Sequence, residues 1–341
     1  MKIEKNKTRR KIIFNLLKLI VSLILLAYFI AFIIIPEWPT IIDSFKNINY
    51  FYLLIVIFIA FPLILVSCLK WQLLLKSKNL NISLSKLIGL YLAGYFFNNT
   101  IPIGFLGGDF VRIYETAKQT KNTPDSLAAV FMERIMGIIA LIMFAIFSIF
   151  LKFQLFLKNP TVLLIIICII TALIIFIWMI FNPKILNLIK NIIKIDLLKK
   201  LFIKVDEWVV AINRYKNERR VIFYSLVYSI IYNLLAILNV YFSFLTFNYK
   251  PNFLDVFIIV PLTLLIVLSA PITSAGLGLF ENAIVYLFSL VGVLSSISAL
   301  VALLLRAKVI LLGLIGGIIY FFIRSDKPKN VKHKNKKESC H

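Results

Sequence analysis

Two short motifs combine residues that could bind an anion within an apolar chain. Each has a proline, then closely spaced glycines, then a carboxylate: Pro102, Gly104, Gly107, Gly108 and Asp109 in the first motif, and Pro271, Gly276, Gly278 and Glu281 in the second. Glycine permits a tight reversal of the backbone, and a carboxylate is favourable at the positive N-terminal end of a helix. Each motif therefore predicts a helix that breaks and restarts, although small residues are also common where membrane helices pack closely.

Arginines extend this pattern. Arg134 follows Asp109 after 25 residues, and Arg306 follows Glu281 after the same interval. An ionised side chain in the middle of a membrane helix costs about 2.5–3.5 kcal/mol on insertion scales, so these charges require a polar cavity or a charged partner. We expect each carboxylate to neutralise its arginine; the alternative is an internal salt bridge that only fixes helix orientation.

The candidate substrate-binding residues are Asp109, Arg112, Glu133, Arg134, Glu281 and Arg306. Together with helix N-termini, the arginines could hold a phosphate group. The sequence predicts no catalytic residue, no metal site and no cofactor. Both histidines lie near the C-terminus, the three cysteines are far apart, and no phosphate-binding loop motif is present.

The composition identifies the environment of these charges. Hydrophobic residues make up 61% of the 341 residues and charged residues only 16%, against roughly 45–50% and about 25% in soluble domains. So much apolar surface requires lipid as the solvent. The formal net charge of +23 is typical of basic cytoplasmic loops that face anionic lipid, and we expect no nucleic-acid partner.

The apolar stretches predict an all-α, polytopic integral membrane protein with about six spanning helices and two re-entrant helical hairpins. A span needs about 20 apolar residues. The predicted spans are 12–35, 51–69, 127–151, 161–181, 221–247 and 297–323. The first is too long for a signal peptide and has no small-residue cleavage site after it.

Basic residues set the predicted orientation. Lys70, Lys76, Lys78 and Lys86 are assigned to the loop after the second span, and Arg112, Lys118 and Lys121 follow the first broken stretch. Both groups are expected in the cytoplasm, so residues 86–111 are predicted to enter and leave on the same side. The same argument makes residues 253–291 a second hairpin, entered from outside. Hairpins from opposite faces indicate an inverted repeat of the kind transporters use.

The remaining segments complete the predicted organisation. Residues 1–11 form a basic cytoplasmic N-terminus, residues 12–323 the transmembrane domain, and residues 324–341 a basic, disordered tail. Within the domain, residues 184–220 suit an amphipathic cytoplasmic helix on the inner leaflet, or a connecting helix that only touches lipid.

At these motifs the sequence resembles a known family. The residues that carry the resemblance are Pro102, Gly104, Gly107, Gly108, Asp109, Arg112, Glu133, Arg134, Gly137, Pro271, Ala275, Gly276, Gly278 and Glu281. They are similar to the transmembrane domain of bacterial lysylphosphatidylglycerol synthases and to its free-standing, flippase-like relatives, over residues 12–323. In the two-part synthases this domain is thought to move the modified lipid between leaflets, whereas a soluble domain attaches the lysine. We expect no aminoacyl transfer by the present chain.

The resemblance and the charges lead to one expected function and two alternatives. We expect a flippase-like protein of the cell membrane, with both termini in the cytoplasm, that translocates an anionic or modified phospholipid head group or a polyprenyl-phosphate lipid. A separate lipid-modifying enzyme is an expected partner. The first alternative is a membrane-embedded transferase or accessory subunit in lipid or polyprenyl-phosphate glycan modification. The second is a scaffold that only localises partner enzymes.

Overall fold

The computed structural model describes residues 2–101, 106–182, 209–269, 273 and 276–325. These residues form helices and no strand, which confirms the all-α prediction. Among them, six helical stretches are long and apolar enough to cross a membrane: Leu16–Ile34, Tyr50–Lys76, Thr123–Leu151, Pro160–Phe181, Arg219–Thr246 and Ser295–Phe322. Each overlaps one of the six predicted spans, because a long apolar run bounded by polar residues is a strong local signal.

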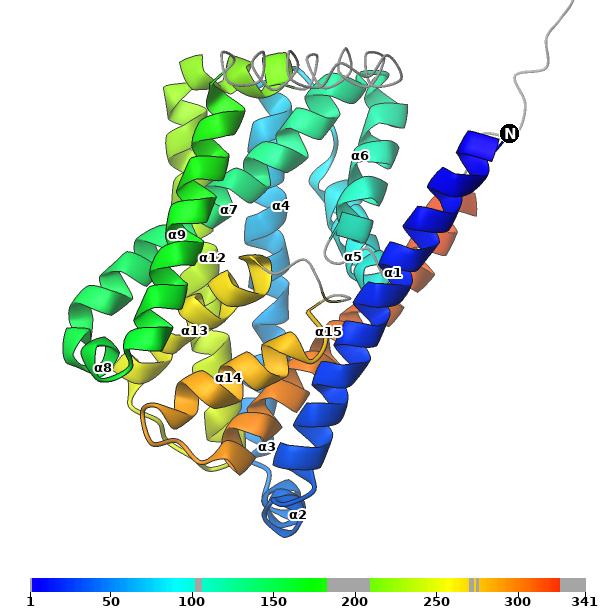
Figure 1. Ribbon diagram of the computed structural model, residues 1–341. Coiled ribbons are helices and arrows are strands. Elements are labelled where there is room, and N and C mark those ends of the chain that lie inside the picture. Colours follow the sequence, from blue (N-terminus) through cyan, green and yellow to red (C-terminus); the bar gives the residue numbers. More distant parts are fainter. Residues whose placement is uncertain (1, 102–105, 183–208, 270–272, 274–275, 326–341) are drawn as a thin grey trace, which may run out of the picture.

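Figure 1 shows the described helices coloured in chain order. Their bounds are α1 Lys2–Phe29, a π-helical turn Ile30–Ile34, α2 Trp38–Lys46, α3 Tyr50–Phe58, α4 Ala60–Lys76, α5 Leu84–Thr100, α6 Leu106–Thr120, α7 Thr123–Leu151, α8 Phe153–Lys158, α9 Pro160–Phe181, a 3₁₀ turn Arg214–Asn217, α12 Arg219–Thr246, α13 Phe253–Ser269, α14 Leu279–Ser289 and α15 Ser295–Ser325.

Both predicted breaks separate two helices. We call α5 and α6 the first helix pair, and α13 and α14 the second helix pair. The second pair matches the predicted stretch 253–291. The first runs further than the predicted 86–111, because α6 continues to Thr120. Polar residues such as Lys118 lie in this last part of α6, where the apolar pattern had already ended and gave no signal of a helix.

The glycines of the first motif have a different role from the one predicted. Gly107 and Gly108 lie in the first turn of α6 rather than in a backbone reversal. A Cβ on Gly108 would lie 2.5 Å from the Gly94 carbonyl oxygen on α5, and one on Gly107 would lie 2.7 Å from the Phe97 carbonyl oxygen. These two glycines therefore allow α5 and α6 to pack closely, which was the alternative explanation for them. Pro102, Gly104 and Pro271 lie outside the described residues.

The buried apolar side chains form two cores. The first core joins α4, α5 and the N-terminal half of α7, and includes Trp71, Leu87 and Met132. The second core joins the C-terminal half of α7 to α9, α12, α13, α14 and α15, and includes Phe244 and Phe288. Along α7 the first core ends near Met136 and the second begins at Ile138. The second core thus contains α13 and α14, whereas the first contains α5 and only touches α6 through the partly buried Ile113.

Glycines also bring α15 against the first helix pair. A Cβ on Gly316 would overlap the Leu92 carbonyl group of α5, and one on Gly317 would lie 2.7 Å from the Phe96 ring. A Cβ on Gly313 would come equally close to the Asn99 side-chain amide. The backbones of α5 and α15 are therefore in close contact over more than one turn.

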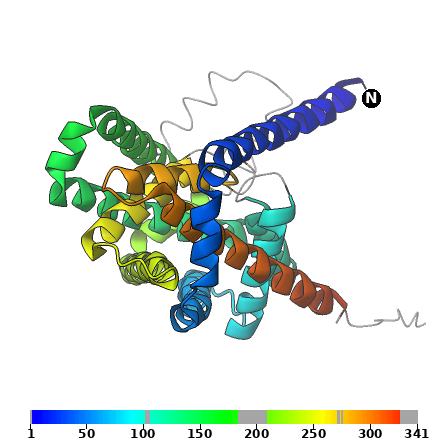
Figure 2. The ribbon, with the colours of Figure 1, turned by 90° about the horizontal axis from the view of Figure 1, so that it is seen from below.

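The first residues of α1 and the last residues of α15 lie at the same end of the bundle (Figure 1). Seen from below, the two helices diverge as they leave the bundle (Figure 2). Of the segment 184–220, residues 184–208 lie outside the described residues, as does the tail from 326 on. In the described part, Tyr215 is fully buried and its hydroxyl donates to the Leu74 carbonyl oxygen at 2.9 Å. This part of the segment packs against the end of α4.

Candidate functional site

A cavity of about 360 Å³ lies between the two cores, lined by residues of α4, α5, α6, α7, α12, α13, α14 and α15. Both helix pairs contribute to it. Asp109 lies in the first turn of α6, and Phe280 in the first turn of α14. Five of the six predicted substrate-binding residues line the cavity: Asp109, Arg112, Glu133, Arg134 and Arg306. The sixth, Glu281, does not line the cavity, but its carboxylate binds Arg306, which does.

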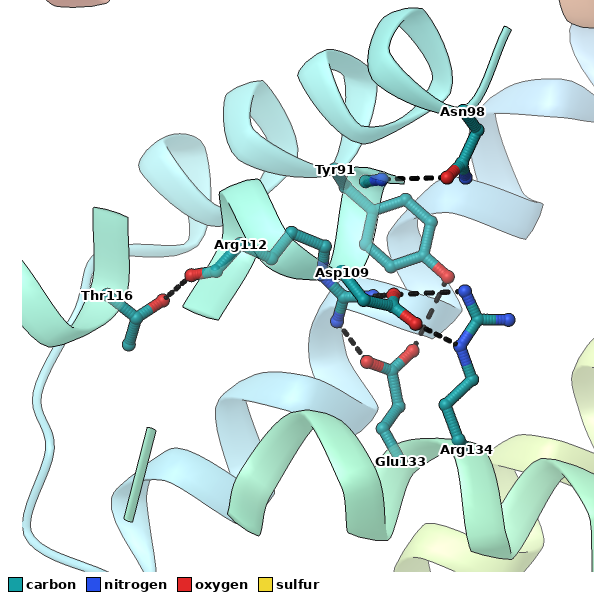
Figure 3. A network of polar contacts seen from close by, with 8 residues as sticks. Tyr91, Asn98, Asp109, Arg112, Thr116, Glu133 and Arg134 are labelled. Carbon is teal, nitrogen blue, oxygen red and sulfur yellow. Dashed lines mark hydrogen bonds and ion pairs between the residues drawn. The ribbon is translucent and has the colours of Figure 1, made fainter. Parts of the chain in front are cut away.

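Asp109 and Arg134 form the first of the two ion pairs that the 25-residue spacing predicts. Arg134 Nε lies 2.8 Å from one carboxylate oxygen of Asp109, and its Nη2 lies 2.9 Å from the other. This two-point contact joins the N-terminal end of α6 to the middle of α7 (Figure 3). This contact confirms the predicted pairing of Asp109 with Arg134. A salt bridge that only fixes helix orientation, the alternative given above, would make the same contact.

Arg112 and Glu133 form a further, more deeply buried ion pair beside Asp109 and Arg134. Arg112 Nη2 contacts a Glu133 carboxylate oxygen, and Nη1 lies 3.4 Å from Asp109. The Arg112 guanidinium carbon lies 4.1 Å from the centre of the Trp71 ring and 4.5 Å from that of the Tyr91 ring. Arginine in this position gains cation–π attraction from both rings. Since only 3% of Arg112 is exposed, it forms part of the cavity wall and fixes the carboxylates beside it.

The second predicted ion pair is also present. Arg306 Nε on α15 lies 2.6 Å from a Glu281 carboxylate oxygen on α14, and Arg306 Nη2 donates to the Gly276 carbonyl oxygen at 3.2 Å. The other Glu281 oxygen accepts a 2.8 Å hydrogen bond from the Gly278 backbone N–H and so caps α14. This confirms that Glu281 neutralises Arg306 and adds a capping role that the spacing alone did not predict.

The turn that precedes α14 requires glycine because of its backbone conformation. Gly276 has φ of 69° and Gly278 has φ of 77°, a region that costs other residues about 1–2 kcal/mol. A Cβ on Gly278 would also lie 2.6 Å from the Leu25 Cβ of α1. The predicted backbone reversal is therefore confirmed at these two glycines, in contrast to Gly107 and Gly108.

Asparagines at the end of α5 hold the first helix pair in place. The Asn98 side-chain oxygen accepts a hydrogen bond from the Gly108 backbone N–H at 2.7 Å (Figure 3). The Asn99 amide donates to the Val309 carbonyl oxygen on α15 at 3.2 Å. Polar residues that would be unfavourable on a lipid-facing helix thus satisfy backbone groups near the cavity.

Two lysines that line cavities, Lys70 and the partly buried Lys308, were not among the predicted site residues. Lys70 was assigned to a cytoplasmic loop, but it lies inside α4 and only 6% of it is exposed. Its ammonium group donates to the Ser229 hydroxyl of α12 at 3.2 Å. Lys308 lies on α15, and its ammonium group contacts the Asn239 side-chain oxygen and, at 3.4 Å, the Val56 carbonyl oxygen. The apolar residues Leu73, Leu74 and Leu75 after Lys70 were the signal that the helix continues past it.

Comparison with known proteins places this architecture among membrane proteins. The family model described as lysylphosphatidylglycerol synthase TM region matches residues 15–317. A UPF0104 membrane protein of Pyrococcus horikoshii is 26% identical over 262 residues, an alignment that covers 71% of this chain and 78% of that protein. No solved structure matches the chain. The match spans both helix pairs and all the charged residues that line the cavity.

Proposed function

The chain belongs to the family of the lysylphosphatidylglycerol synthase TM region, and from that premise we propose that it translocates an anionic or modified lipid head group between the two leaflets of the cell membrane. The observation that carries this proposal is the charged cavity between the two helix pairs. Three arginines and two carboxylates line it, and a third carboxylate, Glu281, pairs with one of these arginines, inside a bundle whose outer helices are apolar. Such charges are costly within a membrane and usually mark the path of a polar substrate.

The size and polarity of the cavity suit a lipid head group. Its volume of about 360 Å³ lies within the range of about 300–1,000 Å³ typical of small-molecule sites. The acyl chains would stay in the bilayer while the phosphate exchanges contacts with Arg134 and Arg306. Asp109 and Glu281 would neutralise these arginines again when the head group has left.

The proposal also interprets the two helix pairs as re-entrant hairpins of an inverted repeat. Each pair is followed by a long helix that supplies an arginine to the carboxylate of the returning helix, α7 in one half and α15 in the other. The first turns of α6 and α14 would direct the positive ends of two helix dipoles toward the centre of the membrane. These ends favour an anionic head group in addition to the arginines.

The distribution of basic residues supports cytoplasmic termini. Lys76, Lys118 and Arg219 lie near the C-terminal ends of α4 and α6 and at the start of α12. These helix ends lie on the same side of the bundle as the first residues of α1 and the last of α15 (Figure 1). An excess of lysine and arginine is typical of the cytoplasmic side. Single cysteines near Lys78 and Thr120 should then be labelled from the cytoplasm, and those near Asn252 and Ser295 from outside. Labelling near Lys78 and Thr120 from opposite sides would contradict the first re-entrant hairpin.

A vesicle experiment tests translocation directly. The purified full chain is reconstituted into phosphatidylcholine vesicles that contain phosphatidylglycerol with a fluorescent short acyl chain, and a membrane-impermeant reductant quenches the outer leaflet. We expect the inner-leaflet fluorescence to become accessible in vesicles with the protein and to stay protected without it. Equal protection in both preparations, for this probe and for fluorescent phosphatidylethanolamine and polyprenyl phosphate, would contradict the proposal. Turnover of a nucleotide-sugar donor would instead favour the transferase alternative.

A further inference from the structure

We propose that Lys70 and Lys308 are phosphate-binding residues at two successive positions along the path of the head group. This inference rests on the proposed function and identifies the phosphate of a lipid as the group that is recognised. The two lysines lie at the cavity of about 360 Å³ and at a neighbouring cavity of about 170 Å³. Their charge adds to that of the arginines in neutralising a phosphate.

The arginines of the site already have carboxylate partners. Glu133 neutralises Arg112, Asp109 neutralises Arg134, and Glu281 neutralises Arg306. These three pairs bring no net charge into the membrane interior. A phosphate that binds only to an arginine would have to separate it from a carboxylate that holds it at close range.

Lys70 has no such partner. Among the described residues, no carboxylate lies within ion-pair distance of its ammonium group, and its hydrogen bond goes to the neutral Ser229 hydroxyl. The side chain lines the larger cavity beside Arg134. A buried ammonium bound only to a neutral group has lost much of its hydration, so an incoming phosphate would gain a strong charge-assisted hydrogen bond.

Lys308 repeats this arrangement at the smaller cavity. Its ammonium group contacts two neutral oxygens, those of Asn239 and Val56, and no carboxylate in the described part of the chain lies within ion-pair distance. The smaller cavity shares Tyr95, Tyr232 and Phe280 with the larger one. The two cavities are therefore adjacent, and the proposed path leads from one to the other.

The two lysines are separated along the direction of the helices. Their partners Ser229 and Asn239 both lie on α12, ten residues apart, which corresponds to about 15 Å of helix. This is about half the thickness of the hydrocarbon core. Two moderate binding positions suit passage better than one tight position, because a permeating anion must leave each site again. Lysine also suits this task, since its flexible stem lets a point charge move with the phosphate.

The test compares Lys70→Gln and Lys308→Gln with Lys76→Gln. Lys76 lies on the same helix as Lys70 but is exposed at its end, so its variant removes the same charge outside the cavities. Binding of phosphatidylglycerol and of diacylglycerol, which lacks the phosphate, is measured by native mass spectrometry of the purified full-length variants. Unfolding temperatures confirm that the variants are folded, which we expect because glutamine retains a hydrogen-bonding group and removes a buried charge.

We expect each cavity variant to bind phosphatidylglycerol about tenfold more weakly than the wild type, the value of one charge-assisted hydrogen bond. Binding of diacylglycerol should not change, and Lys76→Gln should behave as the wild type. Displacement of phosphatidylglycerol by inorganic phosphate in the wild type, weakened in the two variants, would support recognition of the phosphate itself.

Wild-type affinity for phosphatidylglycerol in both cavity variants would overturn the proposal. So would a wild type that binds phosphatidylglycerol no better than diacylglycerol, or lysine-dependent binding of inorganic phosphate that the lipid does not compete with. If the wild type translocates lipid and the variants do so equally well, the lysine proposal fails while the proposed function stands. If the wild type binds phosphatidylglycerol through both lysines but translocates no lipid, the proposed function fails and the binding positions remain.

Discussion

The two helix pairs begin alike and differ in what surrounds their carboxylates. In each, a carboxylate in the first turn of the returning helix binds an arginine 25 residues later. Asp109 directs both oxygens to arginines, Arg134 and Arg112. Glu281 divides its oxygens between Arg306 and the backbone N–H of Gly278. The same sequence pattern therefore supports an electrostatic network in one half and a capped turn in the other.

The neighbouring residues explain this difference. Three residues after Asp109 stands Arg112, whereas Ile284 stands three residues after Glu281. Likewise Glu133 precedes Arg134, but Leu305 precedes Arg306. The second site thus lacks the inner ion pair of the first.

The two arginines that bind these carboxylates also differ in solvent exposure. The Arg134 side chain is 39% exposed and that of Arg306 is 14% exposed. A partly exposed arginine can exchange its carboxylate for another anion at lower cost than an arginine enclosed beside a turn. We therefore expect the first site to respond mainly in activity and the second mainly in stability.

The largest effect is expected from Glu281→Gln. The substitution leaves Arg306 charged and without its carboxylate, at a cost of about 3–5 kcal/mol. The yield of membrane-inserted protein and its unfolding temperature should both fall. The double variant Glu281→Gln/Arg306→Gln should recover yield, since no orphan charge remains, but not lipid translocation. A single variant as stable as the wild type would remove the structural role assigned to this pair.

Asp109→Asn should cost less stability and abolish translocation in vesicles. We expect a loss of about 1–3 kcal/mol, the penalty for a hydrogen-bonded charged group that can still reach polar surroundings. Adding Arg134→Gln should recover stability and not translocation. The comparison of the two sites would be reversed if Asp109→Asn destabilised the protein more than Glu281→Gln does.

Alanine at Gly278 and at Gly108 should destabilise the protein for different reasons. Gly278→Ala places alanine in a left-handed backbone conformation, which should cost about 1–2 kcal/mol of stability. Gly108→Ala pushes α6 away from α5 and should cost about the same. Gly137→Ala is the matched control, because no atom lies within 4 Å of a Cβ at that position. It should stabilise α7 by about 0.5–1 kcal/mol. Thermal unfolding of the three variants measures the difference, and equal unfolding temperatures would contradict both explanations.

The smallest effect is expected from Tyr91→Phe. The variant keeps the ring over Arg112 and removes only the hydroxyl, which lies 3.4 Å from a Glu133 oxygen. A loss of about 0.5–1 kcal/mol is typical of one such hydrogen bond. Tyr91→Leu removes the ring as well and should lower the unfolding temperature further. Equal unfolding temperatures for the two variants would show that the stacked ring does not stabilise Arg112.

The sequence predicted the spans, the two breaks and both long-range ion pairs because each produces a local signal. An apolar run is visible in consecutive residues, and a charge within such a run needs a partner. Asp109, Arg134, Glu281 and Arg306 were identified in this way. Their role in substrate binding remains a prediction.

What the sequence did not predict depends on contacts between distant segments. Lys70 resembles any lysine at the end of a span until Ser229 of α12 is placed beside it. Gly108 has the composition of a turn, and only the position of Gly94 shows that it serves packing. The stack of Trp71 and Tyr91 on Arg112 likewise joins three helices, and no periodicity in one helix contains that information.

The close contact between α5 and α15 has a mechanical consequence. Gly313, Gly316 and Gly317 hold the two backbones together, and α15 also carries Arg306 beside α14. Because backbone and short glycine positions leave little room between α5 and α15, both helix pairs are coupled to one helix, α15. For the proposed translocation we therefore expect the opening that releases a head group to lie where α4, α7 and α12 line the cavity. The two helix pairs are then expected to stay together while α4, α7 and α12 move.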